Sequence, residues 1–239
     1  TALPDDPGLF FGDQASWGPV VDGLVLLEPA AVTLASGGFH HVPVLLGSNA
    51  DEGTLFVWLS GLSDIDEATY VAMVDAGAPA FGTDGATLLA EYPAADYDTP
   101  GAALSALFGH AGFNCPARRA ARAFSAGGVD TYLYHFTHAP DVPLLQGLGV
   151  FHGAEVGLVF GSDHFGLAPL ASDEQALSAA IMGYWGRLGA SGDPNGGAEL
   201  AWPPYDTASD QHLELGDVIQ TGALLLEQKC DFWDGIMGG

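Results

Sequence analysis

The run Val42-Pro-Val-Leu-Leu46 constrains the fold of this chain more than any other stretch. A short, continuous apolar run is typical of a strand buried in a parallel sheet. Gly47 follows it, and a helical pattern begins near Glu52. A second run of aromatic and branched residues, Asp130-Thr-Tyr-Leu-Tyr-His-Phe136, predicts another strand. Strands that alternate with helices indicate an α/β fold with a mostly parallel sheet flanked by helices.

Helices are predicted between and after these strands. Pro116 suits a first helical turn, and Gly127-Gly128 suits a helix end. Ser63 with Asp66, and Ser172, are candidate caps for two other helices. The predicted helical ranges are 63–74, 86–91, 116–125, 173–188 and 223–236. Residues 1–40 are rich in Gly and Pro and are expected to form loops with short strands. Two or three core strands are few for a complete domain, so we expect other strands to come from another segment.

The charge of the chain excludes several classes of partner. Five basic residues against thirty acidic ones give a net charge of −25, and 48% of the residues are hydrophobic. A core of real size is therefore expected, whereas nucleic acid and anionic membrane surfaces would be repelled. No apolar stretch reaches the roughly 18 residues of a membrane span. The first residues lack the basic and apolar regions of a signal peptide, and they resemble the middle of a fold.

Two residues combine as candidates for acid–base chemistry. Glu52 follows the first predicted strand beside Gly53, where α/β folds place their site residues. His152 lies between Gly149 and Gly153, which allow the backbone to bend and present the ring. An acid followed by a histidine is the order found in the serine hydrolase triad of α/β enzymes. The alternatives are a solvated helix start at Glu52 and an ordinary loop histidine. No serine of the chain lies in a Gly-x-Ser-x-Gly motif.

The cysteines and the remaining histidines leave alternatives open. Cys115 and Cys230 are either two buried free thiols or one disulfide that closes a long loop. The adjacent His40 and His41 would point to opposite faces of a strand end, and no Cys-x-x-Cys motif occurs, so no metal ligand set is expected. Arg118 and Arg122 lie one helical turn apart and are expected to pair with acids in a structural role.

Six segments, in order, resemble the C-terminal half of the type-B carboxylesterase family, the cholinesterase-like branch of the α/β-hydrolases. They are Trp17-Gly-Pro-Val-Val-Asp-Gly23, Val42-Pro-Val-Leu-Leu-Gly47 with Asp51-Glu-Gly53, Phe113-Asn-Cys-Pro116, Val150-Phe-His-Gly153, Tyr184-Trp185 with Gly192-Asp-Pro-Asn195, and Cys230-Asp-Phe-Trp233. The resemblance runs nearly from end to end, so residues 1–239 are expected to be the C-terminal part of a single α/β-hydrolase domain.

The resemblance implies hydrolysis of carboxylic esters by a Ser-Glu-His triad. Glu52 takes the role of the acid and His152 that of the base, with no metal or organic cofactor. An N-terminal fragment of the same enzyme is expected to supply the serine and the oxyanion hole. The resemblance also favours a disulfide between Cys115 and Cys230, and hence a secreted or periplasmic protein.

The substrate pocket is expected to include Leu55, Phe56 and Phe151. Near the start of the chain, Gly12, Ala15 and Ser16 stand where cholinesterases narrow the acyl pocket with aromatic residues, which implies room for acyl groups larger than acetyl. Gly157 replaces an acid that cholinesterases keep near the histidine, which weakens the expectation of choline esters as substrates.

The alternative function is that of a non-catalytic cholinesterase-like adhesion or interaction domain. A shared fold does not imply a shared function, because relatives of this kind lose the nucleophile. The presence of both Glu52 and His152 favours the enzyme.

Overall fold

The computed structural model describes residues 20–237. The strands are β1 (Val44–Asn49), β2 (Thr131–Phe136), β3 (Gln211–Leu215) and β4 (Ile219–Ala223). The α-helices are α1 (Ala30–Ser36), α2 (Thr54–Leu59), α3 (Glu67–Gly77), α4 (Gly85–Glu91), α5 (Pro100–Gly109), α6 (Cys115–Ala126), α7 (Val156–Phe160), α8 (Ser172–Ser191) and α9 (Glu227–Met237). A π-helix, η3 (His110–Asn114), joins α5 to α6, and 3₁₀ turns cover η1 (Ala78–Phe81), η2 (Ala94–Asp96) and η4 (Gln146–Leu148).

The four strands form one mixed sheet in the order β1-β2-β3-β4. β1 pairs in parallel with β2, and β2 with β3, whereas β4 runs antiparallel to β3. The prediction of an α/β fold with a mostly parallel sheet is confirmed. β1 is a terminal strand of this sheet, so its outer edge has no neighbouring strand among residues 20–237.

β1 lies two residues beyond the apolar run that predicted it. Val42 is exposed, and the strand begins at Val44, whose N–H donates to the carbonyl of Asp130. Pro43 has no N–H to donate, which explains why the ladder cannot begin earlier. The ladder instead extends through the polar residues Ser48 and Asn49, which are buried. The strand thus delivers polar side chains to its carboxyl end.

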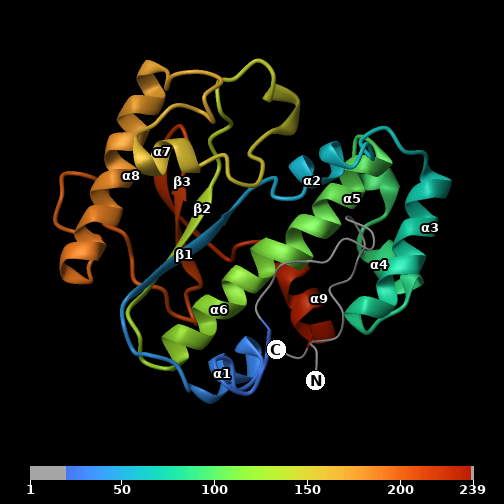
Figure 1. Cartoon of the computed structure of the whole chain (residues 1–239), viewed down its shortest axis with the longest axis horizontal. Helices are drawn as coiled ribbons and strands as arrows, with labels where there is room; N and C mark the ends of the chain where they lie inside the picture. The colour runs from blue at the N-terminus through green and yellow to red at the C-terminus, as the bar shows by residue number, and fades with distance from the viewer. Residues whose placement is uncertain (1–19, 238–239) are drawn as a thin grey trace.

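Helices cover both faces of the sheet (Figure 1). Along β2, Tyr132 and Phe136 face the core shared with α7 and α8, while Leu133 faces Ala121 of α6. This alternation follows from the two-residue period of a strand. The core between the sheet, α7 and α8 also contains Leu158, Leu177, Ile181, Tyr184, Trp202, Leu213 and Leu215.

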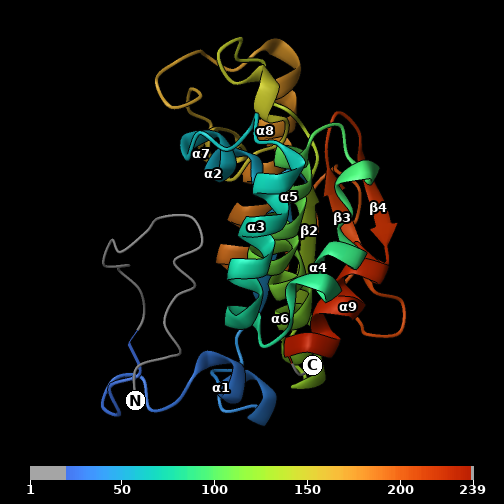
Figure 2. The same cartoon turned by 90° about the vertical axis from the view of Figure 1, so that its right-hand side faces the viewer.

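A second core lies beside the sheet, where α2, α3, α4 and α5 pack together (Figures 1 and 2). Its buried residues include Val57, Tyr70, Val74, Leu88, Tyr92, Leu104, Leu107 and Trp233. Trp233 comes from α9, so the last helix joins this group to the rest of the chain. The group carries the segments that pack against the loop containing Glu52.

Three predicted helix starts are wrong, two because of side-chain hydrogen bonds at the helix start and one because of strand pairing. α3 begins after Asp66, whose side chain accepts from the N–H of Thr69, rather than at Ser63. α8 begins at Ser172 itself, and Glu174 accepts from the N–H of Ala171. The last helix begins at Glu227, because residues 219–223 pair with β3 as β4.

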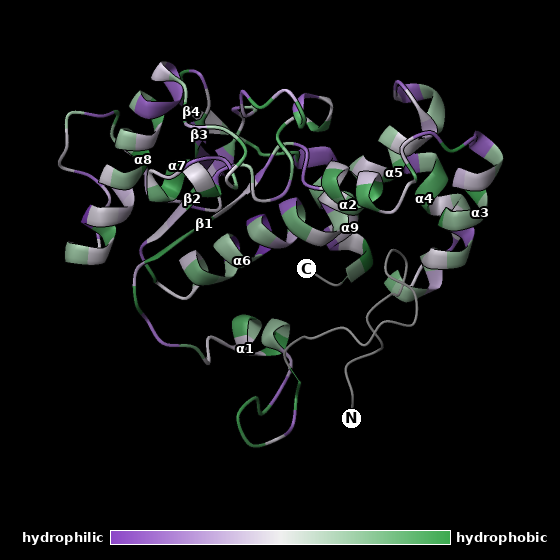
Figure 3. Ribbon diagram, turned by 45° about the horizontal axis from the view of Figure 1, so that its top comes forward, coloured by the Kyte–Doolittle hydropathy of each residue, from purple (hydrophilic) through white to green (hydrophobic). Residues whose placement is uncertain are grey.

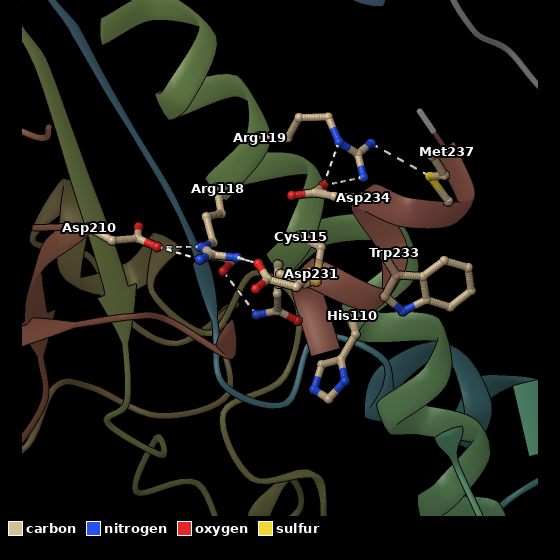
Figure 4. The surroundings of a disulfide bond; sticks show 12 residues. His110, Cys115, Arg118, Arg119, Asp210, Asp231, Trp233, Asp234 and Met237 are labelled. Carbon is tan, nitrogen blue, oxygen red and sulfur yellow. Dashed lines mark hydrogen bonds and ion pairs between the residues drawn. A yellow bond between two sulfur atoms is a disulfide. The ribbon is translucent and has the colours of Figure 1, made fainter. Parts of the chain in front are cut away.

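Cys115 and Cys230 form a disulfide that joins α6 to α9, as the resemblance implied. Beside it, the buried Arg118 lies between Asp210 and Asp231 (Figure 4). Its Nε donates to Oδ2 of Asp210 at 2.6 Å, and its Nη1 donates to Oδ1 of Asp231 at 3.0 Å. Arg122 contacts Asp210 and Asp234. Both arginines therefore have the expected structural role.

Candidate active site

Glu52 lies in the turn between β1 and α2, and its carboxylate is buried. Oε1 accepts a hydrogen bond from the backbone N–H of Asn49 at 2.7 Å. The turn packs closely against α5, since a Cβ on Gly53 would lie 1.9 Å from the carbonyl oxygen of Ser105. Glycine is therefore required beside the acid, and the packing fixes the position of Glu52.

The loop that carries His152 is joined to this turn by backbone pairing. Asp51 and Phe151 form a parallel bridge, and Oδ2 of Asp51 accepts from the N–H of Val150 at 2.8 Å. Gly149 adopts φ 61° and ψ −137°, which only glycine adopts readily. A side chain there would also meet the carboxylate of Asp51, because a Cβ would lie 2.4 Å from its Oδ2. Residues 49–53 and 149–153 thus meet although they are far apart in the sequence.

The two loops bring Glu52 and His152 into direct contact. Nδ1 of His152 lies 2.6 Å from Oε2 of Glu52. A carboxylate accepts only, so Nδ1 carries a proton and donates it. The ring is 44% exposed, and its Nε2 has no hydrogen-bond partner among residues 20–237. In the neutral ring with its proton on Nδ1, Nε2 is the basic nitrogen.

Glu52 also tunes the basicity of this ring. The hydrogen bond from His152 to Glu52 raises the pKa of His152 above its ordinary 6.5, although partial burial opposes the rise. The charges of Glu52 and Glu155 add to it. The carboxylate therefore both orients the ring and stabilises its protonated form, as a triad acid does.

Aromatic rings form one wall beside His152. The centroid of Phe113 lies 4.6 Å from that of His152, and the centroid of Phe56 lies 5.2 Å from it. Phe108 packs against both phenylalanines. Phe56 was expected at the pocket, whereas Phe108 and Phe113 were not, because α5 and η3 were not predicted.

The other predicted pocket residues lie elsewhere. Leu55 is half-buried and packs against the core of the sheet. Phe151 is 2% exposed and belongs to that core, so its side chain offers no surface to a ligand. The next residue, His152, is by contrast 44% exposed. Gly12, Ala15 and Ser16 lie outside the described residues.

Polar residues around the pair were missed by the sequence interpretation. The buried side chain of Asn49 donates to the carbonyl of Phe151 and to Glu155, and Asn114 donates to the carbonyl of Asn49. Asn114 stands directly before Cys115, within the segment Phe113-Asn-Cys-Pro116. That segment could have drawn attention to it, whereas no local pattern marks Asn49.

The described residues contain neither a membrane helix nor a metal cluster. Across residues 20–237, none of the helices is both long and apolar enough to cross a bilayer. In the same range, no three side chains of His, Cys, Asp or Glu are grouped in a way that could hold a metal ion.

Comparison with known proteins gives one consistent result. The model of the carboxylesterase family matches residues 10–233. Acetylcholinesterase 1 of Caenorhabditis elegans is 29% identical over 271 residues, which cover 93% of this chain and 41% of the relative. Carboxylesterase 4A of Bos taurus is 30% identical over 230 residues, which cover 90% of this chain and 41% of the relative. The chain thus spans about two fifths of the length of these curated relatives.

Proposed function

The chain belongs to the carboxylesterase family, and from that premise we propose that it supplies the acid and the base of a serine ester hydrolase. The contact between Glu52 and His152, in which Glu52 takes Nδ1 and the ring is 44% exposed, is the observation that carries the proposal. Ester hydrolysis in general accords with the family. The division of the triad between this chain and another segment is the specific part of the proposal.

The nucleophile and the oxyanion donors come from a segment outside this sequence. Two observations support this division. No serine here lies in Gly-x-Ser-x-Gly, and the chain spans only about two fifths of its relatives. The missing segment is an N-terminal fragment of the same enzyme in the order typical of α/β-hydrolases, which is serine, acid, histidine.

Exposed apolar residues mark where that segment would dock. Val20, Leu24, Val25 and Leu27 are all more than half exposed, and Figure 3 shows a green stretch in the loop that precedes α1. The unpaired outer edge of β1 offers backbone donors and acceptors to a further strand. Both features are costly in water, and one additional set of strands would cover them.

The reaction follows from the positions of the proton-transfer groups. Nε2 of His152 removes the proton from the serine hydroxyl while the serine oxygen attacks the ester carbonyl. Backbone N–H groups of the missing segment stabilise the resulting oxyanion. His152 then gives the proton from Nε2 to the departing alcohol, which leaves an acyl-enzyme. Water, deprotonated by the same nitrogen, releases the carboxylic acid. Glu52 keeps the proton on Nδ1 and stabilises the charged ring throughout.

We propose that the protein is secreted or periplasmic, and the disulfide between Cys115 and Cys230 supports this, because disulfides persist in oxidising compartments. The small-molecule substrate is a carboxylic ester, and neither a metal nor an organic cofactor is needed for the steps above. We propose no macromolecular ligand with a positively charged surface.

Labelling of the intact protein with a fluorophosphonate tests the proposal. We expect one serine outside the sequence of this chain to be labelled, and we expect His152→Ala to slow the labelling severely. Turnover of a nitrophenyl ester by the intact protein should disappear in the same variant. A label on a serine of this chain would contradict the proposal. An intact protein that neither reacts nor turns over the ester would instead favour the non-catalytic adhesion or interaction domain.

A further inference from the structure

Asn49 contacts three parts of the candidate site at once. It is the last residue of β1 and is 1% exposed. Its backbone N–H donates to Oε1 of Glu52 at 2.7 Å. Its side-chain Nδ2 donates to the carbonyl oxygen of Phe151 at 2.8 Å and to Oε2 of Glu155 at 2.6 Å. The carbonyl of Phe151 belongs to the peptide bond that leads into His152.

The side-chain amide of Asn49 can take only one orientation. Both of its partners, a carbonyl oxygen and a carboxylate, accept hydrogen bonds and cannot donate them. If the amide were turned over, its oxygen would face both acceptors. In the observed orientation Oδ1 is buried without a partner among residues 20–237. A buried polar atom without a partner is rare, and here it accompanies two donations that are directed at the site.

Asn114 supports Asn49 from the opposite side. Its Nδ2 donates to the carbonyl oxygen of Asn49 and to Oγ of Ser48, each at 2.9 Å. Asn114 is fully buried and lies in η3, whose π-helical geometry is often found at functional sites. Its own Oδ1 is also buried without a partner among the described residues. Asn114 therefore holds the end of β1, and Asn49, at that end, holds the residue before His152 and Glu155.

We propose that Asn49 is a positioning residue for the acid and the base. Its backbone N–H holds the carboxylate of Glu52. Its side chain holds the peptide bond before His152 and also the carboxylate of Glu155. This inference rests on the proposed function, since positioning matters for turnover only if the pair is catalytic. It predicts that Asn49 determines the rate of the chemical step and not the binding of the ester.

The test replaces Asn49 by leucine in the intact esterase. Leucine has a similar shape, retains the backbone N–H to Glu52, and removes both side-chain donations. We expect kcat to fall roughly 100-fold, the size of effect that a small misplacement of a catalytic group produces. We expect KM for a nitrophenyl ester to change by less than about threefold, since the ester does not touch Asn49.

Asn195 provides a matched control. Its Nδ2 also donates to one carbonyl, that of Trp202, and to one carboxylate, that of Asp193. Its loop lies at the other end of the sheet, where Gly192 approaches Pro43, the residue before β1. Asn195→Leu therefore removes the same two kinds of donation far from His152, and it also removes Oδ1 as the acceptor for the N–H of Trp202, so it is the more disruptive change of the two. Its kcat should remain within about threefold of the original enzyme.

Three outcomes would overturn the inference. In the first, Asn49→Leu has an unchanged kcat. In the second, Asn49→Leu loses activity only through a higher KM. In the third, Asn195→Leu loses as much kcat as Asn49→Leu does. If Asn49→Leu does not fold, Asn49→Ser is judged by the same criteria, because serine is too short to reach both acceptors and leaves room for water. Failure of the proposed function has a different signature, since the unmodified protein would then not turn over esters.

Discussion

The chain contains two clusters in which a buried glutamate accepts hydrogen bonds from histidine, and they differ in what the histidine can still do. In the first, His152 donates to Glu52, and its ring is 44% exposed. In the second, His138 and His164 both contact Oε1 of Glu174, and His164 is fully buried. The same residue types therefore give a reactive arrangement in one place and a closed one in the other, and the access to the second nitrogen separates them.

The Glu174 cluster holds separate segments together. Besides the two histidines, its carboxylate accepts from the N–H groups of Asp141 and Ala171. These donors come from the loop after β2 and from the segment between α7 and α8. Glu174 thus holds the first part of the segment between β2 and α7, the segment that also contains His152. Its role is structural, whereas Glu52 faces a group that can exchange a proton with a ligand.

Replacing one histidine from each cluster tests this comparison most strongly. With His152 as the proposed general base, His152→Ala should lower kcat of the intact protein for esters by about 10⁶-fold. His164→Ala should leave kcat within a few-fold and lower the free energy of unfolding by on the order of 3 kcal/mol, because a buried ring and its hydrogen bond are removed. Ester turnover and denaturant unfolding measure the two effects. Equal losses of activity in both variants would contradict the distinction.

The two glutamates should differ in the same way. Glu52→Gln should reduce kcat by about 10⁴-fold, because glutamine neither holds the ring in its tautomer nor stabilises its charge. The acid limb of the pH–rate profile should also move to lower pH in any residual activity, since the hydrogen bond to Glu52 raises the pKa of His152. Stopped assays with a nitrophenyl ester from pH 5 to 9 measure both, and near-normal turnover in Glu52→Gln would exclude it as the triad acid.

Glu174 should instead affect stability, and that effect should depend on pH. Burial alone would raise the pKa of Glu174, but hydrogen bonds from Ala171, Asp141, His164 and His138 outweigh it and lower the pKa from 4.5 to about 2. A lowered pKa in the folded state adds stability that is present above pH 4.5 and lost as the pH falls toward 2. This difference corresponds to roughly 3 kcal/mol for this buried group.

Unfolding of the intact protein at several pH values measures this contribution. The free energy of unfolding of Glu174→Gln should lie about 3 kcal/mol below that of the original protein at pH 7, and the gap should narrow as the pH falls from 4.5 toward 2. A constant gap across that range would show that the ionised carboxylate is not the source of the stability.

The smallest predicted effect concerns the second carboxylate beside His152. Glu155→Gln removes a charge that raises the pKa of His152 but keeps an acceptor for Nδ2 of Asn49. The acid limb of kcat/KM should therefore move to lower pH, and by less than in Glu52→Gln, because the charge of Glu155 is the smallest of the contributions that raise the pKa of His152. A pH–rate profile measured at low salt would reveal the shift, and a move to higher pH would contradict it.

The sequence singled out two residues that the structure brings into contact, but not the residues that hold them. Glu52 and His152 were singled out because a strand end and a glycine-framed loop are local patterns. Their partners Asn49 and Asn114 were not, because their hydrogen bonds join residues 65 to 106 positions apart. No short stretch of sequence contains that information.

The prediction missed helices and strands where a residue is present for close packing with another segment and not for its own backbone conformation. No helix was predicted at Pro100 and Gly101, yet they begin α5, and a Cβ on Gly101 would lie 2.2 Å from the carbonyl of Ser63. That glycine permits a close approach of two segments. β3 and β4 were missed because they are short, and β4 is a polar strand at the end of the sheet, without an apolar pattern.

The disulfide between Cys115 and Cys230 has a consequence for how the protein is made. The two cysteines are separated by 115 positions, and the second lies in the last helix. At roughly 5–20 residues per second, a ribosome needs about 6–23 s to travel between them. During that interval Cys115 has no cysteine of this sequence to pair with, because Cys230 is the only other one, and its thiol stays free of that bond. Closure of the bond is therefore a late event in biosynthesis, which joins the segment of Phe113 and Asn114 to the rest of the fold only after translation has passed residue 230.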